Sequence, residues 1–356
     1  MSLRRHACLA AAAAAALTAF SCSKAPDDPL CKYDALPSSA NVPAGQGAVR
    51  ISAPTDETFW VSDSAGKEVN RAQLNTAAAV KPGDYVVKLN NSHHTVHVRA
   101  NSMATCTAGT VLTRGDTDEP YYVLDTTGAE IARNHIGSSL AFFPGLYKVK
   151  VNNSTRDVEV KPSAVAQVQT ATLTVAGDTD ESYYVLDSSG TELARNHLGR
   201  PLAFLPGAGT VKVNNTTAPV SMNAATPTVV KTGALLVRGT TDEDYYVYNS
   251  VGSEIARQHL NSPLSFLPGA YTVKVNHSDI AAKVEAGSTA EYQTATLTVN
   301  GKGDAYYSVL DKNGTELGHN RMNSPLAFAE GSYTVKVGND VRPVSLTASK
   351  STVLNW

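Results

Sequence analysis

The chain has 356 residues, 42% of them hydrophobic and 17% charged, with a formal net charge of −2 at pH 7. It therefore lacks both the basic excess that nucleic-acid binding needs and the strong net charge of disordered chains, and no nucleic-acid partner is expected. Length alone predicts roughly two or three domains, but one segment recurs along the chain and predicts five smaller ones.

Residues 1–21 are typical of an export signal, with Arg4 and Arg5 before an Ala-rich apolar run over residues 7–20. The stretch LTAFSC resembles a bacterial lipoprotein box, which implies that Cys22 is lipidated; ordinary cleavage or a retained leader are the alternatives. Ser23 resembles the signal for outer-membrane sorting. We therefore expect an outer-membrane lipoprotein of the cell envelope, facing the periplasm or the cell surface and reaching the membrane through its lipid anchor.

Residues 22–48 are rich in Pro, Ser, Ala and Gly without sustained periodicity, which predicts a tether. Of the four cysteines, Cys8 lies in the leader and Cys22 is assigned to lipid, which leaves Cys31 and Cys106. An exported pair is most simply a disulfide, although two unrelated thiols are the alternative. The disulfide would stabilise the fold by about 4 kcal/mol and tie the tether to the first repeat.

The rest of the chain is a tandem array, because equivalent residues recur every 62 positions. The period is shown by Asp118, Asp180, Asp242 and Asp304. The predicted repeats are 49–110, 111–172, 173–234, 235–296 and 297–356. The first and last are the most divergent, as expected of repeats at the ends of an array.

Each repeat is predicted to be all-β. The third contains the strand-like runs ATLTVAG, YYVLD, PLAFL, TVKVN and APVSM, with a type I turn at DSSG and a tight hairpin at VNNT. About six short strands and no helix predict a small β-sandwich or barrel. The fold expected is thus an array of five small β-sandwich repeats.

Comparing the copies predicts which side chains are buried, since positions that stay apolar in all five repeats are expected to lie inside. In YYVLD the constant frame is Phe59 and Val61 in the first repeat and Tyr183 and Val185 in the third. Leu202, Phe204 and the two valines of VKV are also predicted to be buried, and the lysine between those valines to face outward.

The repeats resemble the PEGA family, small exported β-sandwiches of bacterial envelope proteins, and more loosely other transthyretin-like sandwiches. The residues that carry the resemblance are LTV, YYVLD, SPLSFLPGAYTVKV at 262–275 and VEAG at 284–287. GDTDESYY stands where the family has its Pro-Glu-Gly-Ala tetrapeptide. The resemblance covers residues 49–356 and implies envelope-associated binding or scaffolding without catalysis.

Three recurring features are candidates for chemistry. The first is the acidic loop GDTDE, whose carboxylates could bind calcium; its spacing matches no calcium-loop motif, and solvated acids are the alternative. The second is the motif ARNH or ARQH, whose Arg and His share one strand face and could bind an anionic polymer or discourage edge pairing. Its residues are Arg133 and His135, Arg195 and His197, and Arg257 and His259.

The third feature is an outward aromatic row that could stack on the sugar rings of a polysaccharide, or pack between neighbouring repeats. Its residues are Trp60, Tyr122, Tyr184 and Tyr246. Ser308 occupies the aromatic position in the last repeat, which favours packing between repeats.

Near-identical repeats offer no unique set of converging groups, so no catalysis, metal or cofactor is expected. Two functions remain: a lipid-anchored structural scaffold of the envelope, or a multivalent binding module for an envelope polysaccharide, peptidoglycan or a protein partner. A continuous polar stripe would favour binding, whereas polar residues at the repeat junctions would favour structure.

Overall fold

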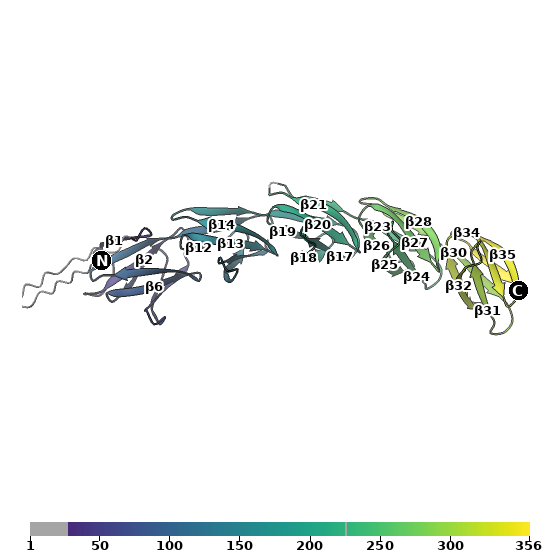
Figure 1. Cartoon of the computed structure of the whole chain (residues 1–356), viewed down its shortest axis with the longest axis horizontal. Helices are drawn as coiled ribbons and strands as arrows, with labels where there is room; N and C mark the ends of the chain where they lie inside the picture. The colour runs from purple at the N-terminus through teal and green to yellow at the C-terminus, as the bar shows by residue number, and fades with distance from the viewer. Residues whose placement is uncertain (1–27, 225) are drawn as a thin grey trace, which may run out of the picture.

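The computed structural model describes residues 28–224 and 226–356, and it is an elongated, gently curved row of five β-units (Figure 1). The predicted leader (1–21) and Cys22 lie outside the described residues. Every assigned element is a strand, so the all-β array of repeats is confirmed. No helix of the described ranges is long and apolar enough to cross a membrane.

Each unit contains seven strands that repeat in the same order. Unit 1 has β2 (Gly47–Ser52), β3 (Thr58–Ser62), β4 (Glu68–Gln73), β5 (Ala77–Val80), β6 (Gly83–Leu89), β7 (Ser92–Val98) and β8 (Ser102–Thr107), preceded by β1 (Cys31–Ala35). Unit 2 has β9 (Gly109–Arg114), β10 (Pro120–Leu124), β11 (Glu130–His135), β12 (Ser139–Phe142), β13 (Gly145–Val151), β14 (Ser154–Val160) and β15 (Val165–Gln169). Unit 3 has β16 (Ala171–Ala176), β17 (Ser182–Leu186), β18 (Glu192–His197), β19 (Pro201–Phe204), β20 (Gly207–Val213), β21 (Thr216–Met222) and β22 (Thr228–Lys231). Unit 4 has β23 (Gly233–Arg238), β24 (Asp244–Tyr248), β25 (Glu254–His259), β26 (Leu264–Phe266), β27 (Gly269–Val275), β28 (Ser278–Val284) and β29 (Thr289–Gln293). Unit 5 has β30 (Ala295–Asn300), β31 (Tyr306–Leu310), β32 (Glu316–Arg321), β33 (Pro325–Phe328), β34 (Gly331–Val337), β35 (Asp340–Leu346) and β36 (Ser351–Asn355).

The strands of a unit form two sheets. In unit 3 a four-stranded antiparallel sheet has the order β18-β17-β20-β21, and a second, short sheet has the order β19-β16-β22. In the short sheet β22 runs parallel to β16. The sequence predicted about six strands in each repeat, and the strand that it missed is the last one of each unit.

The core of each unit contains the side chains that stay apolar in all five repeats, as the sequence comparison predicted. Phe59, Tyr183, Val185 and Phe204 are fully buried, and their counterparts in the other units are buried too. The buried Tyr183 hydroxyl donates a hydrogen bond to Arg200 O at 2.7 Å, and Tyr121, Tyr245 and Tyr307 do the same 17 residues ahead. These tyrosines can therefore be buried, because each hydroxyl group donates a hydrogen bond to a backbone carbonyl.

The predicted turns are also present. Gly190 N donates to Asp187 O, and the Asp187 carboxylate accepts hydrogen bonds from Ser189 N and Thr191 N. In the Asn-rich hairpin, Asn214 and Asn215 both have positive φ, at 43° and 59°. This pair of left-handed residues is what a two-residue type I′ hairpin requires.

Part of the predicted tether is folded, which corrects the sequence prediction for residues 31–35. β1 pairs antiparallel with β8 at the edge of the short sheet of unit 1, in a register that sets Cys31 opposite Cys106. These two cysteines form the predicted disulfide. Cys31 belongs to the core of unit 1 and the side chain of Tyr33 packs against that core. The sequence prediction missed this five-residue strand, which lies between prolines.

Successive units are joined by a single residue. Ala108, Thr170, Thr232 and Thr294 each stand between the last strand of one unit and the first strand of the next, and all four are buried. Thr232 N and Oγ1 both bond to Ala176 O, which fixes the connection to unit 3. The connections therefore have no slack of the kind a flexible linker provides.

Candidate functional site at the unit junctions and the outer sheet face

The acidic loop of each unit supplies a carboxylate to the next unit. Glu181 accepts hydrogen bonds from the backbone N of Ser265 at 2.8 and 3.1 Å and from Asn214 Nδ2 at 2.6 Å. Ser265 lies in β26 of the following unit and is fully buried. Glu57, Glu119 and Glu243 make the same contact with Ala141, Ala203 and Ala327. The glutamate of the loop is therefore a junction residue, which neither sequence interpretation of the loop foresaw.

The Asn-rich hairpin completes this junction. Asn214 Nδ2 also donates to Ser265 O at 3.0 Å, and Asn215 Nδ2 donates to Ile255 O at 3.1 Å. The Thr216 hydroxyl accepts the backbone N–H of Leu267 at 3.2 Å. The side chains of one unit thus bind the free backbone edge of β26, an edge that would otherwise be exposed. The contacts of Asn214 and Thr216 recur at all four junctions, whereas His277 stands at the position of Asn215 at the junction of units 4 and 5.

Apolar packing accompanies these hydrogen bonds. Leu267 is 4% exposed and belongs to the core of unit 3, although it lies just after β26 of unit 4. Phe143 and Leu205 occupy the same place in the cores of units 1 and 2. Burial raises the pKa of Tyr245, and the nearby Glu181 carboxylate adds to the shift. A glutamate of one unit thus lies close to the central tyrosine of the next.

Units 1 and 5 each have different residues at the junction positions on the side where no neighbouring unit is described. In unit 5, Ala305, Gly338 and Asp340 stand at the positions of the junction Glu, Asn and Ser or Thr. In unit 1, Lys81 stands at the position of Phe143 and Leu205, and Phe59 replaces the tyrosine that lies beside a preceding glutamate. A sixth unit could therefore not dock on either end through the same contacts.

The outer face of the four-stranded sheets carries the candidate binding residues in rows. Tyr184 lies directly across from Arg195 on one side and from Lys212 on the other. The same row is repeated in units 1, 2 and 4: Arg71, Trp60 and Lys88; Arg133, Tyr122 and Lys150; Arg257, Tyr246 and Lys274. These aromatic rings are half-buried and belong to none of the hydrophobic cores of the described units. The lysines escaped the sequence-based selection because they were judged only as outward-facing.

Nearby acids balance much of the positive charge on this face. His197 Nδ1 lies 3.3 Å from Asp180, His135 lies 3.4 Å from Asp118, and His259 lies 2.7 Å from Asp244. Arg133 lies 3.6 Å from Glu130. The structure therefore separates the predicted Arg-His pairs into Arg beside the aromatic row and His beside the acidic loop. The three histidines and Arg133 are therefore exposed charges with an acid nearby.

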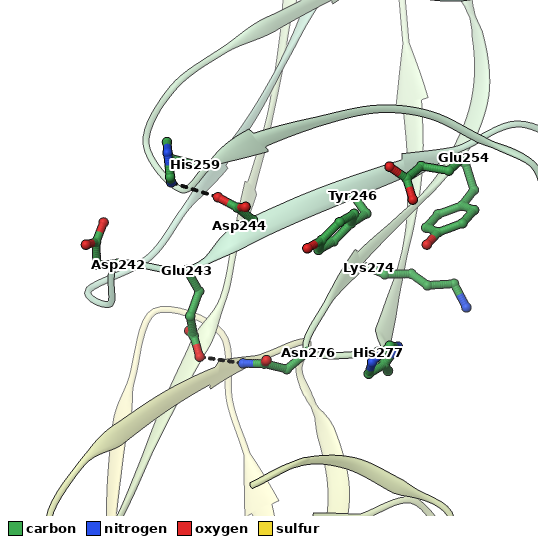
Figure 2. Close-up of a pocket in the computed structure, with 10 residues that line it drawn as sticks. Asp242, Glu243, Asp244, Tyr246, Glu254, His259, Lys274, Asn276 and His277 are labelled. Carbon is green, nitrogen blue, oxygen red and sulfur yellow. Dashed lines mark hydrogen bonds and ion pairs between the residues drawn. The ribbon is translucent and has the colours of Figure 1, made fainter. Parts of the chain in front are cut away.

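Shallow grooves lie along this face. One, of about 330 Å³, is lined by Tyr122 and Lys150 of unit 2 and by Arg195 of unit 3, so the rows of adjacent units meet across a junction. A larger one of about 520 Å³ lies on unit 4, where Figure 2 shows Tyr246 between the paired Asp244 and His259 on one side and the Glu254 carboxylate on the other, with Lys274 below Glu254. Figure 2 also shows Glu243 bound to Asn276 at the lower rim, next to unit 5.

Asp28, Cys31 and His94 form the one cluster of potential metal ligands among the described residues. The Cys31 sulfur is in the disulfide, and Asp28 Oδ2 bonds His94 Nε2 at 2.9 Å. The cluster instead holds the start of the described chain beside the junction of units 1 and 2, since the ring of His94 packs at a tilt against Phe143 of unit 2, with the ring centroids 5.4 Å apart.

No family model matches the chain, so the resemblance to PEGA repeats stays a prediction. No curated protein matches it either. Among solved structures, it is similar to the TIE protein of Bacillus anthracis, at 11% identity and a TM-score of 0.17 over 91% of this chain and 74% of that one. It is also similar to the major pilin subunit of Bacillus cereus (12% identity, TM-score 0.18, 70% and 98% covered) and to the minor pilin of Streptococcus agalactiae (11% identity, TM-score 0.16, 53% and 94% covered). Identities and TM-scores this low establish no common function.

Proposed function

We propose that the protein is a lipid-anchored structural scaffold of the bacterial cell envelope, in which five β-sandwich units form a stiff spacer of fixed length. The observation that carries the proposal is the junction set of Glu, Asn and Ser or Thr, which is present in units 1–4 and replaced in unit 5. A stiff array suits a spacer because it holds its ends apart without the entropic retraction of a flexible linker. The proposal assigns the protein no catalytic role.

The anchor part of the proposal rests on Cys22 and on the position of Asp28. At most about 20 Å of extended chain separates these two residues, because each residue spans at most ~3.5 Å. Asp28 is fixed beside the junction of units 1 and 2 by His94 and the neighbouring disulfide. A lipidated Cys22 would therefore hold this junction near the membrane, and an outer-membrane location is part of the proposal.

Two measurements test the scaffold. Mass spectrometry of the purified protein is expected to find an acylated N-terminal Cys22, and an unmodified or retained leader would remove the anchor. Small-angle X-ray scattering of the soluble chain from Ser23 onward, extrapolated to low concentration so that the monomer is measured, is expected to give one extended particle with the shape of the array in Figure 1. A scattering profile of independent, tumbling units would contradict the stiff spacer.

A second candidate function is multivalent binding, because the rows of aromatic and cationic side chains repeat and meet across a junction. Charge compensation favours an uncharged stretch of envelope polysaccharide or peptidoglycan over an anionic polymer, since aromatic faces can stack on sugar rings. The test is retention of the soluble array on these polymers. Replacing Tyr122, Tyr184 and Tyr246 by Ala is expected to abolish retention, whereas replacing the exposed turn residues Thr126, Ser188 and Ser250 by Ala is not. Equal retention of both variants would rule out the aromatic row.

A further inference from the structure

The last strand of each unit lies at one edge of the short sheet. In unit 1 this strand, β8, is covered by β1, in the order β1-β8-β2-β5. In units 2–5 the equivalent strands end their sheets: β15, β22, β29 and β36. We refer to these four as the open-edge strands. They pair with one strand on their inner side and with no other strand among the described residues.

The open-edge strands have backbone groups directed outward. Thr232 N donates to Ala176 O on the β16 side. Because successive residues of a strand direct their backbone groups to opposite sides, the N–H groups of Val229 and Lys231 point away from β16. In unit 1 the position equivalent to Lys231 is Thr107, whose N–H donates to Leu30 O at 2.9 Å. Unit 1 thus shows that this edge accepts an extended antiparallel segment.

Exposed apolar side chains mark three of the four open-edge strands. Val165 of β15, Val229 of β22 and Val353 of β36 are 46%, 56% and 53% exposed. An edge strand with unpaired backbone groups and exposed valines is a template for pairing with another chain. At the equivalent positions of β8, where β1 covers the edge, Met103 is buried and Thr105 is half-buried.

The charges on the two central open-edge strands, β22 and β29, indicate which partner fits them. β22 ends in Lys231, whereas β29 carries Glu291 in its middle, and the Glu291 carboxylate lies 2.9 Å from Arg238 Nε of its own unit, so Lys231 of a second copy would share this carboxylate with Arg238. The backbone N–H groups of Lys231 and Glu291 both point away from the inner strand of their sheet. For Glu291 this follows because Thr294 N donates to Arg238 O of β23 and the backbone groups alternate in direction along a strand. A register that sets Val229 against Gln293 of a second copy also sets Lys231 against its Glu291. Two arrays aligned in the same direction would instead oppose Lys231 to Lys231, which is unfavourable.

We infer that two copies of the protein pair side by side and antiparallel, with β22 of each copy joined to β29 of the other about a two-fold axis between units 3 and 4. The strands run along the array, because the end of one unit continues into the next through one residue, so antiparallel arrays present antiparallel edges. Each interface strand occurs twice, as a two-fold axis requires. β1 and its disulfide keep the edge of unit 1 out of this pairing. The inference goes beyond the spacer and does not depend on the anchor.

Sedimentation equilibrium of the soluble chain from Ser23 onward tests the pairing. The expected result is a monomer–dimer equilibrium. Lys231→Glu and Glu291→Lys are each expected to weaken association by about tenfold or more, because the altered charge pair occurs twice. The double variant K231E/E291K is expected to restore it, which no misfolded protein would do. Lys212→Glu, on the outer face of the four-stranded sheet in unit 3, is the matched control and is expected to leave association unchanged.

A covalent test fixes the register. In the variant carrying both Val229→Cys and Gln293→Cys, the two cysteines of one chain lie in different units, and oxidation is expected to give a covalent dimer. A monomeric mass at all concentrations, or a dimer that ignores the charge reversals and forms no such crosslink, would overturn the inference. A monomer that binds a synthetic peptide with the β1 sequence, its Cys31 replaced by Ser, would assign the open edges to a segment of another protein and would equally overturn it.

Discussion

Removing the Glu181 carboxylate is expected to loosen one junction and leave the others intact. In Glu181→Ala the buried N–H of Ser265 loses the carboxylate that accepts its hydrogen bonds at 2.8 and 3.1 Å. The Asn214 amide loses one of its two hydrogen-bond acceptors and keeps Ser265 O. An unsatisfied buried donor costs about 1–3 kcal/mol, while the half-buried Asn214 amide can turn to water at little cost. The expected loss at this junction is therefore about 2 kcal/mol.

Hydrogen–deuterium exchange measures this loss at the affected amide. Because about 1.4 kcal/mol corresponds to a factor of ten, 2 kcal/mol predicts roughly 30-fold faster exchange at Ser265 and its neighbours, through local opening. The equivalent amide of Ala203, bound by Glu119, is expected to keep its protection. Asp180→Ala is the matched control, since this carboxylate of the same loop is 99% exposed. Unchanged exchange at Ser265, or an equal effect of Asp180→Ala, would refute the role of Glu181.

Three further predictions follow from the same contacts. Leu267→Ala removes a side chain from the core of unit 3 and is expected to destabilise the adjoining units by about 2–5 kcal/mol in chemical unfolding, whereas Val251→Ala, at an 81% exposed position, is expected to change little. Replacing Cys31 and Cys106 by Ser opens a loop with a sequence separation of 75 and is expected to cost about 4 kcal/mol, seen as earlier unfolding of unit 1 while unit 4 is unaffected. Burial raises the pKa of Tyr121, Tyr183, Tyr245 and Tyr307 above the ordinary value of 10.0, so their contribution to stability is complete below pH 10 and is lost as the pH rises further. Absorbance titration is expected to show these phenols ionising only as the array unfolds; their free ionisation in the folded protein would contradict the burial.

The repeat made the interior of each unit predictable from sequence. Five aligned copies separated the inward frame of Tyr183 and Val185 from the outward frame, and the two cysteines left after the leader and lipid assignments were correctly paired. Short strands without such alternation were harder to detect. β1 is a five-residue strand between prolines, and β22 has four residues with only partial burial.

The junctions were missed because their partners are far apart in sequence. Glu181 meets Asn214 after 33 residues and Ser265 after 84 residues, and no single-unit pattern connects them. The available signal was the presence of Ala305 and Gly338 at the positions where units 1–4 have the junction Glu and Asn. The sequence comparison applied this reasoning only to Ser308, at the aromatic position of the outer row.

Distances between spin labels on adjacent units test the central claim that the units form a stiff array. Cysteines at Ser188 and Ser250, exposed turn residues of units 3 and 4, span one junction, and Thr126 with Ser188 spans the preceding one. Both pairs are expected to give a single narrow distance distribution, and Glu181→Ala combined with Asn214→Ala is expected to broaden only the first. Broad distributions for both pairs in the unaltered protein would contradict the stiff array.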